Sequence, residues 1–158
     1  MLQLAIEKVT YFSLKFIRPK AGLSKGFQLE VYMEYQFIDD PITGAAMAKF
    51  SLDHEVIGPW LEVEVGTDAV KLEQLLSAMV EIEQEKQSEI TITGSEYSVI
   101  FNRGDVTVQT NASMDGIEVL PDSLVEENID FDQQDSSSCG QEDFREILLS
   151  WAKFVGKY

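Results

Sequence analysis

The 158-residue sequence contains little cysteine, little histidine and little positive charge, and it has no long apolar run. Its single cysteine, Cys139, excludes an internal disulfide and favours a reducing compartment. No apolar stretch approaches the ~18 residues that a membrane-spanning helix requires. The first ten residues lack the basic segment and the long apolar segment of a secretory signal. We therefore expect a cytoplasmic protein that neither spans nor binds a membrane.

Basic residues are few, 12 against 28 acidic ones, so the formal net charge is −16. Lys and Arg supply most of the affinity for phosphate backbones and anionic lipids, so direct binding to nucleic acid or membranes is disfavoured. Such an acidic surface either maintains solubility or attracts a basic surface, for example that of a nucleic-acid-handling protein. The charge is uneven, at +3 for residues 1–32 and −19 for residues 33–158. We interpret residues 1–32 as a basic N-terminal extension, of the kind an overcalled start codon produces, and residues 33–158 as one domain.

The first half of the sequence changes from strand patterns to a helix pattern. Residues 11–17 and 34–52 are typical of strands, the latter forming a hairpin because residues 39–44 are dense in turn formers. The β-branched residues of 56–65, interrupted by Gly58 and Pro59, predict an extended segment with a bend. Apolar residues at three- and four-residue spacings then predict an amphipathic helix over 67–86, with Thr67 or Asp68 as its N-cap.

The second half returns to strands and closes with a helix. Alternation over 89–110 predicts an antiparallel meander, and residues 111–140 predict a long acidic loop in which Ser136–Ser138 serve as loop and helix cap. A strong apolar stripe predicts a helix over 141–158. The expected fold class is α+β, with an antiparallel β-sheet (hairpin plus meander) and two amphipathic helices packed on one face.

The single histidine, His54, lies between Asp53 and Glu55 and six residues before Trp60. A zinc protease motif would need a second histidine at position 58, which is glycine. A nucleophilic dyad of Cys139 and His54 is conceivable, but one cysteine and one histidine occur together by chance in many small domains, so a structural histidine is the better interpretation. We assign no catalytic residue, metal or cofactor, and we keep His54, Glu55 and Trp60 as a candidate interaction site.

The acidic residues of 126–135 are a weak candidate for binding a divalent cation. Asp130, Asp132 and Asp135 are spaced like the start of a calcium-binding loop. That loop needs glycine at its sixth position, which here is Asp135, and glutamate at its twelfth, which here is Gln141. A solvated acidic loop is the favoured interpretation.

From Met33 onward the sequence resembles the YacL family of small acidic bacterial proteins whose function is uncharacterised. The resemblance covers 126 of the 158 residues and begins where the charge changes sign. The residues that carry it are Met33–Phe37, Asp40, Thr43, Gly44, Ser51–Trp60, Gly94–Tyr97, Asn111 and Cys139–Phe144. It implies no activity, so no functional residue is carried over from the family.

These observations favour a non-enzymatic, acidic accessory protein that binds a basic protein partner. The evidence for an enzyme is weak, because no complete set of catalytic residues is present in the sequence. The alternative is a small-molecule-binding protein or a cryptic enzyme with a site near His54, Glu55 and Trp60. The sequence does not indicate an oligomeric state.

Overall fold

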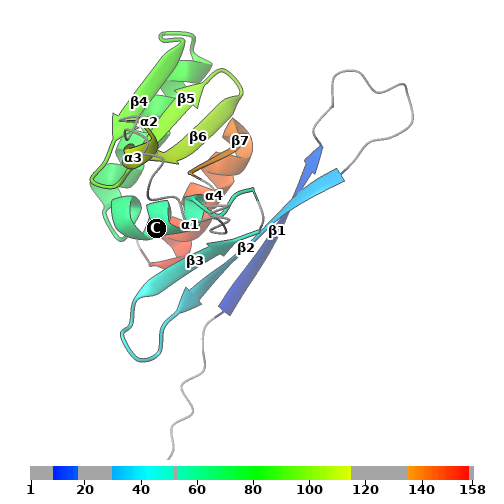
Figure 1. Cartoon of the computed structure of the whole chain (residues 1–158), viewed down its shortest axis with the longest axis vertical. Helices are drawn as coiled ribbons and strands as arrows, with labels where there is room; N and C mark the ends of the chain where they lie inside the picture. Colours follow the sequence, from blue (N-terminus) through cyan, green and yellow to red (C-terminus); the bar gives the residue numbers. More distant parts are fainter. Residues whose placement is uncertain (1–8, 18–29, 52, 115–134, 157–158) are drawn as a thin grey trace, which may run out of the picture.

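The computed structural model describes residues 9–17, 30–51, 53–114 and 135–156, which form two antiparallel sheets and a layer of helices (Figure 1). Sheet A contains, in spatial order, β1 (Val9–Ile17), β2 (Glu30–Asp39) and β3 (Ala46–Phe50). Sheet B contains β4 (Glu89–Thr93), β5 (Tyr97–Asn102), β6 (Asp105–Thr110) and β7 (Ser136–Gly140). The α+β class, the hairpin and the meander are therefore confirmed.

The predicted hairpin is β2 and β3, and the Asp40 side chain stabilises its turn. Asp40 Oδ1 accepts a hydrogen bond from the Ile42 amide at 2.9 Å, and Oδ2 accepts one from the Thr43 hydroxyl at 2.7 Å. The strand expected over 11–17 is confirmed as β1, which pairs with β2 along its whole length. The charge boundary at Met33 falls inside β2, and the interpretation of residues 1–32 as an extension stays a prediction.

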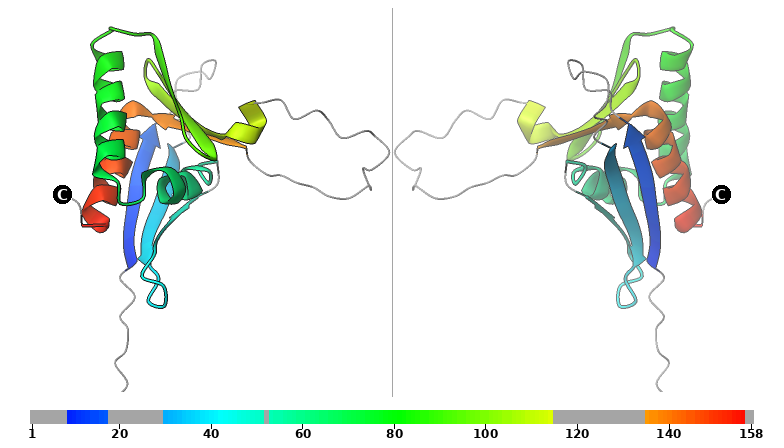
Figure 2. Two further views of the ribbon diagram at one scale, coloured as in Figure 1. Left: turned by 90° about the vertical axis from the view of Figure 1, so that its left-hand side faces the viewer. Right: turned by 90° about the vertical axis from the view of Figure 1, so that its right-hand side faces the viewer.

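The two predicted helices, α2 (Ala69–Glu83) and α4 (Gln141–Phe154), lie side by side against one face of sheet B (Figure 2). Asp68 caps α2, since its Oδ1 accepts hydrogen bonds from the amides of Val70 and Lys71 at 2.9 and 3.2 Å. Most of the apolar residues that predicted these helices are buried, among them Leu72, Leu75, Met79 and Ile82 in α2, and Phe144, Ile147, Leu148 and Trp151 in α4.

Aromatic contacts of α4 join the two sheets into one core. Phe144 packs edge-on against Phe101 of sheet B, with ring centroids 5.8 Å apart. About two helical turns further along α4, Trp151 packs edge-on against Phe37 of sheet A, with ring centroids 5.1 Å apart. Trp60 completes the cluster, with its ring centroid 5.2 Å from that of Phe144. Such aromatic pairs add stability beyond the area that they bury.

The segment 56–65 is helical, so the prediction of an extended chain was wrong. The short helix α1 (Ile57–Trp60) continues directly into a π-helical turn, η1 (Leu61–Val65). The β-branched residues suggested a strand, yet the buried residues recur at helical spacing: Ile57, Trp60, Leu61 and Val65. Pro59 lies in the first turn of the helix, where its missing N–H is not needed.

This helical segment is fixed against β3 on one side and α4 on the other. A Cβ atom at Gly58 would overlap the carbonyl oxygen of Ala48, so only glycine allows α1 to lie this close to β3. Glu62 Oε1 also accepts a hydrogen bond from the Ala48 amide at 2.7 Å. At the end of η1, the Trp151 indole donates a hydrogen bond to the Gly66 carbonyl at 2.8 Å.

The prediction of a loop over 111–140 was wrong at both ends of that range. Residues Asn111–Met114 form a short helix, α3, and Ser136–Gly140 form β7, while residues 115–134 lie outside the described part of the chain. Serines have little strand preference, but pairing with β6 buries Ser137 and Cys139 on one face. Gly140 rather than a serine is the N-cap of α4, so the predicted serine cap was wrong as well.

Candidate functional site

The three residues of the candidate interaction site differ in their exposure to solvent. His54 is only 6% exposed and Trp60 only 1% exposed, whereas Glu55 is exposed to solvent. The backbone of His54 is held in a turn, since its amide donates to the Ser51 carbonyl and its carbonyl accepts from the Ile57 amide, both at 3.1 Å. The indole of Trp60 is part of the aromatic core, so its ring offers almost no surface to a partner in this conformation.

The other two chemical hypotheses rest on Cys139 and on the acidic loop. Cys139 is fully buried in β7, so its thiol has no open path to a dissolved substrate. Asp130 and Asp132 lie outside the described residues. Asp135 is exposed, and its carbonyl accepts a hydrogen bond from the Thr110 amide at 3.0 Å. In the described part of the chain, no group of three or more histidine, cysteine or acidic side chains is arranged to hold a metal ion.

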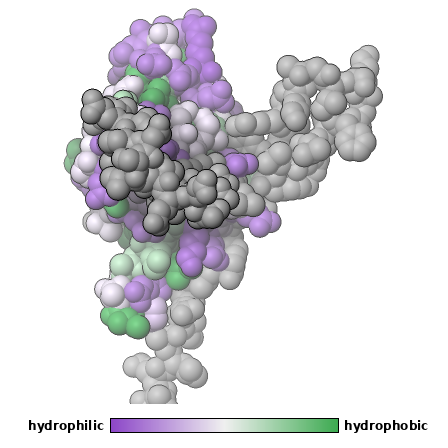
Figure 3. All heavy atoms as spheres, in the orientation of Figure 1, coloured by the Kyte–Doolittle hydropathy of each residue, from purple (hydrophilic) through white to green (hydrophobic). Residues whose placement is uncertain are grey.

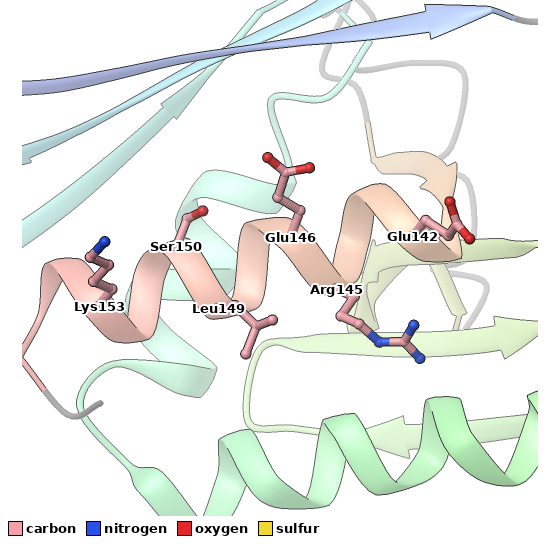
Figure 4. A pocket seen from close by; sticks show the side chains of 6 residues that line it. All are labelled: Glu142, Arg145, Glu146, Leu149, Ser150 and Lys153. Atoms are coloured by element: carbon pink, nitrogen blue, oxygen red, sulfur yellow. The ribbon is translucent and has the colours of Figure 1, made fainter.

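The exposed face of α4 instead combines a cavity with acidic side chains. Glu142, Arg145, Glu146, Leu149, Ser150 and Lys153 line a shallow groove of about 290 Å³, which we call the α4 groove. Figure 4 shows Glu146 and Ser150 projecting from one side of the helix and Leu149 and Arg145 from the other. Glu142 and Glu146 are both exposed, and the Leu149 side chain is 47% exposed. The groove therefore offers two exposed carboxylates and apolar surface together, alongside two basic side chains, Arg145 and Lys153.

Asp143, beside the groove, experiences this negative charge directly. Burial raises the pKa of the Asp143 carboxyl above its ordinary value, and the charges of Glu146 and Glu142 raise it further. A backbone hydrogen bond and, to a smaller extent, His54 oppose this shift in the Asp143 pKa, so the buried histidine lies close enough to Asp143 to affect its carboxyl. The negative charges of Glu142 and Glu146 therefore act on Asp143, and a positive charge would bind favourably near such a group of like charges.

Arg145, a basic side chain in the lining of the groove, already contacts another helix. Arg145 forms an ion pair with Glu83 of α2, and Arg103 pairs with Glu85 at 3.4 Å. Neither of these two ion pairs of the described residues involves the carboxylate of Glu142, Asp143 or Glu146. Acidic residues in a first helical turn also interact favourably with the helix dipole, which accounts for part of their presence. The dipole does not account for Glu146, which lies in the second turn.

Comparison with known proteins places residues 33–155 within an uncharacterised protein family, UPF0231. The chain belongs to this family. It is 36% identical over 126 residues to a UPF0231 protein of Shewanella oneidensis, an alignment that covers 79% of this chain and 98% of the relative. A UPF0231 protein of Vibrio cholerae is 33% identical over 126 residues, covering 78% of this chain and 95% of the relative. No solved structure matches the chain.

Several residues that carry the family resemblance form a structural network around Glu64 in this UPF0231 chain. The amides of Glu96 and Tyr97 donate to Glu64 Oε1 at 2.8 and 3.1 Å, so this carboxylate organises the turn between β4 and β5. Asn111 extends the network, since its Nδ2 donates to the Gly94 carbonyl at 3.1 Å and its Oδ1 accepts from Ser98 Oγ at 2.6 Å. These hydrogen bonds give Glu64 and Asn111 a structural role at the turn between β4 and β5.

Sequence reasoning missed the α4 groove because it considered the apolar stripe of this helix and not its exposed face. The available signal was the four-residue spacing of Glu142, Glu146 and Ser150, which places them on one side of the helix. Leu149 interrupts the polar surface there. On the face shown in Figure 3, the described surface has hydrophilic areas and separate apolar patches. In the described part of the chain, no helix is long and apolar enough to cross a membrane.

Proposed function

We propose that this UPF0231 protein is a non-enzymatic accessory protein that binds a basic protein partner through its acidic surface. The observation that carries the proposal is the group of exposed carboxylates on α4, beside which Arg145 is held by Glu83 of α2. The net charge of −19 over residues 33–158 extends the attraction beyond this contact. A field of this sign accelerates encounters with positively charged surfaces and repels nucleic acid and anionic membranes.

A cytoplasmic partner in the nucleic-acid-handling machinery fits this charge, because such proteins carry the basic surfaces that an acidic protein can cover. The identification with the YacL family belongs to the same proposal. Its support is the order and spacing of the residues between Met33 and Phe144.

The experiment is affinity purification of the chromosomally tagged full-length chain over a series of salt concentrations. A partner held by charge is retained at low ionic strength and released as salt screens the interaction. The matched variants are Glu142→Gln with Glu146→Gln on α4, and Glu73→Gln with Glu89→Gln at exposed positions elsewhere. Each double variant removes two negative charges. Binding of a specific partner should therefore be lost only in the double variant on α4. If no basic protein is retained at low salt, the proposal is wrong.

A further inference from the structure

The α4 groove has the shape that another helix fills. Its six lining residues form two rows of four-residue spacing: Glu142, Glu146 and Ser150 in one row, and Arg145, Leu149 and Lys153 in the other. Rows of this spacing are the ridges of an α-helix, and the groove between them accepts a ridge of a second helix. From the first to the last lining residue, α4 rises by about 16 Å, roughly three helical turns.

The two rows differ in chemistry, and the difference defines the occupant. The first row is acidic at Glu142 and Glu146, and the hydroxyl of Ser150 ends it. In the second row, Arg145 is held by Glu83, so the accessible contacts are the half-exposed aliphatic side chain of Leu149 and the exposed Lys153. An occupant therefore needs a lysine or arginine near Glu146 and an aliphatic side chain over Leu149. Lys153 repels a second cation at the far end of the groove and so sets the direction of the occupant.

A helix fits this surface better than an extended segment does. An extended chain must find partners for its backbone N–H and C=O groups, whereas a helix satisfies its own. The groove is lined by the side chains of a helix whose backbone groups are already bonded within it. We propose that the α4 groove is the docking site for a basic amphipathic helix of the partner protein, an inference that rests on the proposed function.

The test uses the full-length chain and two fluorescent peptides of about 18 residues, long enough to form helix on binding. The first peptide places lysines and leucines on one helical face. The second has the same composition in shuffled order, so it has the same charge but no such face. Binding is measured by fluorescence anisotropy at several salt concentrations. We expect the amphipathic peptide to bind at least about tenfold more tightly than the shuffled one.

The variants separate the groove from the general charge of the surface. Leu149→Ser should remove the preference for the amphipathic peptide while leaving the shuffled peptide's affinity unchanged. Val70→Ser, at an apolar residue of α2 that is 76% exposed, should leave the preference intact. Circular dichroism and thermal melting check that both variants are folded, which we expect for substitutions at exposed positions.

Two outcomes would overturn the inference, and they have different consequences for the proposed function. Equal, salt-sensitive binding of the two peptides refutes the helix-docking groove but leaves the electrostatic proposal in place. Absence of salt-sensitive binding by either peptide contradicts both. A preference for the amphipathic peptide that survives Leu149→Ser places the helix elsewhere and also refutes the groove.

Discussion

Glu64 and Ser95 form a double hydrogen bond between η1 and the turn that joins β4 to β5. The Ser95 amide donates to Glu64 Oε2 at 3.0 Å, and the Ser95 hydroxyl donates to Oε1 at 3.1 Å. Glu62, two residues earlier, bonds to the backbone of β3. One short helical segment therefore holds sheet A with one carboxylate and sheet B with another. These contacts give η1 a structural role, and its contribution to stability can be measured.

Glu64→Gln should lower the free energy of unfolding by about 2 kcal/mol, because hydrogen bonds to a charged acceptor contribute roughly 1.5–3 kcal/mol. Urea denaturation at neutral pH measures the loss. The control is Glu73→Gln on the exposed face of α2, which should change stability by less than about 0.5 kcal/mol. Equal stability of wild type and Glu64→Gln would contradict the structural role.

The same substitution should show a defined pH dependence. Burial alone would raise the pKa of Glu64, but hydrogen bonds from Glu96, Tyr97 and Ser95 lower it below the ordinary value. A carboxyl whose pKa is depressed by folding stabilises the protein above the unfolded-state pKa of about 4.3 and loses that effect as pH falls through the folded-state pKa. The stability difference between wild type and Glu64→Gln should therefore shrink as pH is lowered below about 4.3.

Gly94→Ala should act through Glu64. A Cβ atom at Gly94 would overlap the Glu64 carboxylate, which must then move away from the turn. In a double-mutant cycle, Gly94→Ala and Glu64→Gln should together cost at least about 0.5 kcal/mol less than the sum of the single substitutions. Additive losses would show that the carboxylate keeps its place when the methyl group is added.

Gly58→Ala should destabilise the chain by about 1–3 kcal/mol, the usual cost of overpacking. The atom that the new methyl group meets is the backbone oxygen of Ala48, which cannot move without displacing β3. The matched control is Pro59→Ala at the neighbouring exposed position, for which we expect a change within about 1 kcal/mol. Thermal unfolding of the two variants side by side makes the comparison.

Trp60→Ala should reduce stability by about 3–5 kcal/mol, as truncation of a fully buried aromatic side chain does. Trp60→Phe should cost less, because the contact with Phe144 is partly retained. Chemical denaturation of both variants tests this. If Trp60→Ala leaves stability unchanged but weakens partner binding, Trp60 is an interaction residue. Its side chain would then be exposed to the partner in the bound state.

Tyr35→Phe should change the response to alkaline pH. Burial raises the pKa of the Tyr35 phenol to about 12; the nearby Ser150 hydroxyl opposes the shift, and the charges of Glu146 and Asp143 add to it. A group with a raised folded-state pKa contributes stability that is complete below the unfolded-state pKa of about 10 and is lost as pH rises towards the folded-state value. Between these values wild type should therefore lose stability more steeply than Tyr35→Phe, which urea denaturation over this pH range measures.

Much of the fold could be predicted from local patterns. The α2 and α4 helices and the strands of the meander follow from apolar periodicity, because one face of each element must be buried. The segment 56–65, which contains α1 and η1, was misjudged because its β-branched residues, Val56, Ile57, Val63 and Val65, favour strands. The polar strand β7 could not be found in this way, since its strand conformation depends on pairing with β6, which is distant in sequence.

The sequence by itself determined the acidic character, the helical and strand periods and the family, because composition and spacing are properties of the chain alone. The tertiary structure decided which of the candidate residues are accessible. It buried His54 and Trp60, because the helix that carries Trp60 packs between β3 and α4, and it left Glu142, Glu146 and Leu149 on the surface. Burial depends on which elements meet, and such contacts between distant segments leave no local pattern in the sequence.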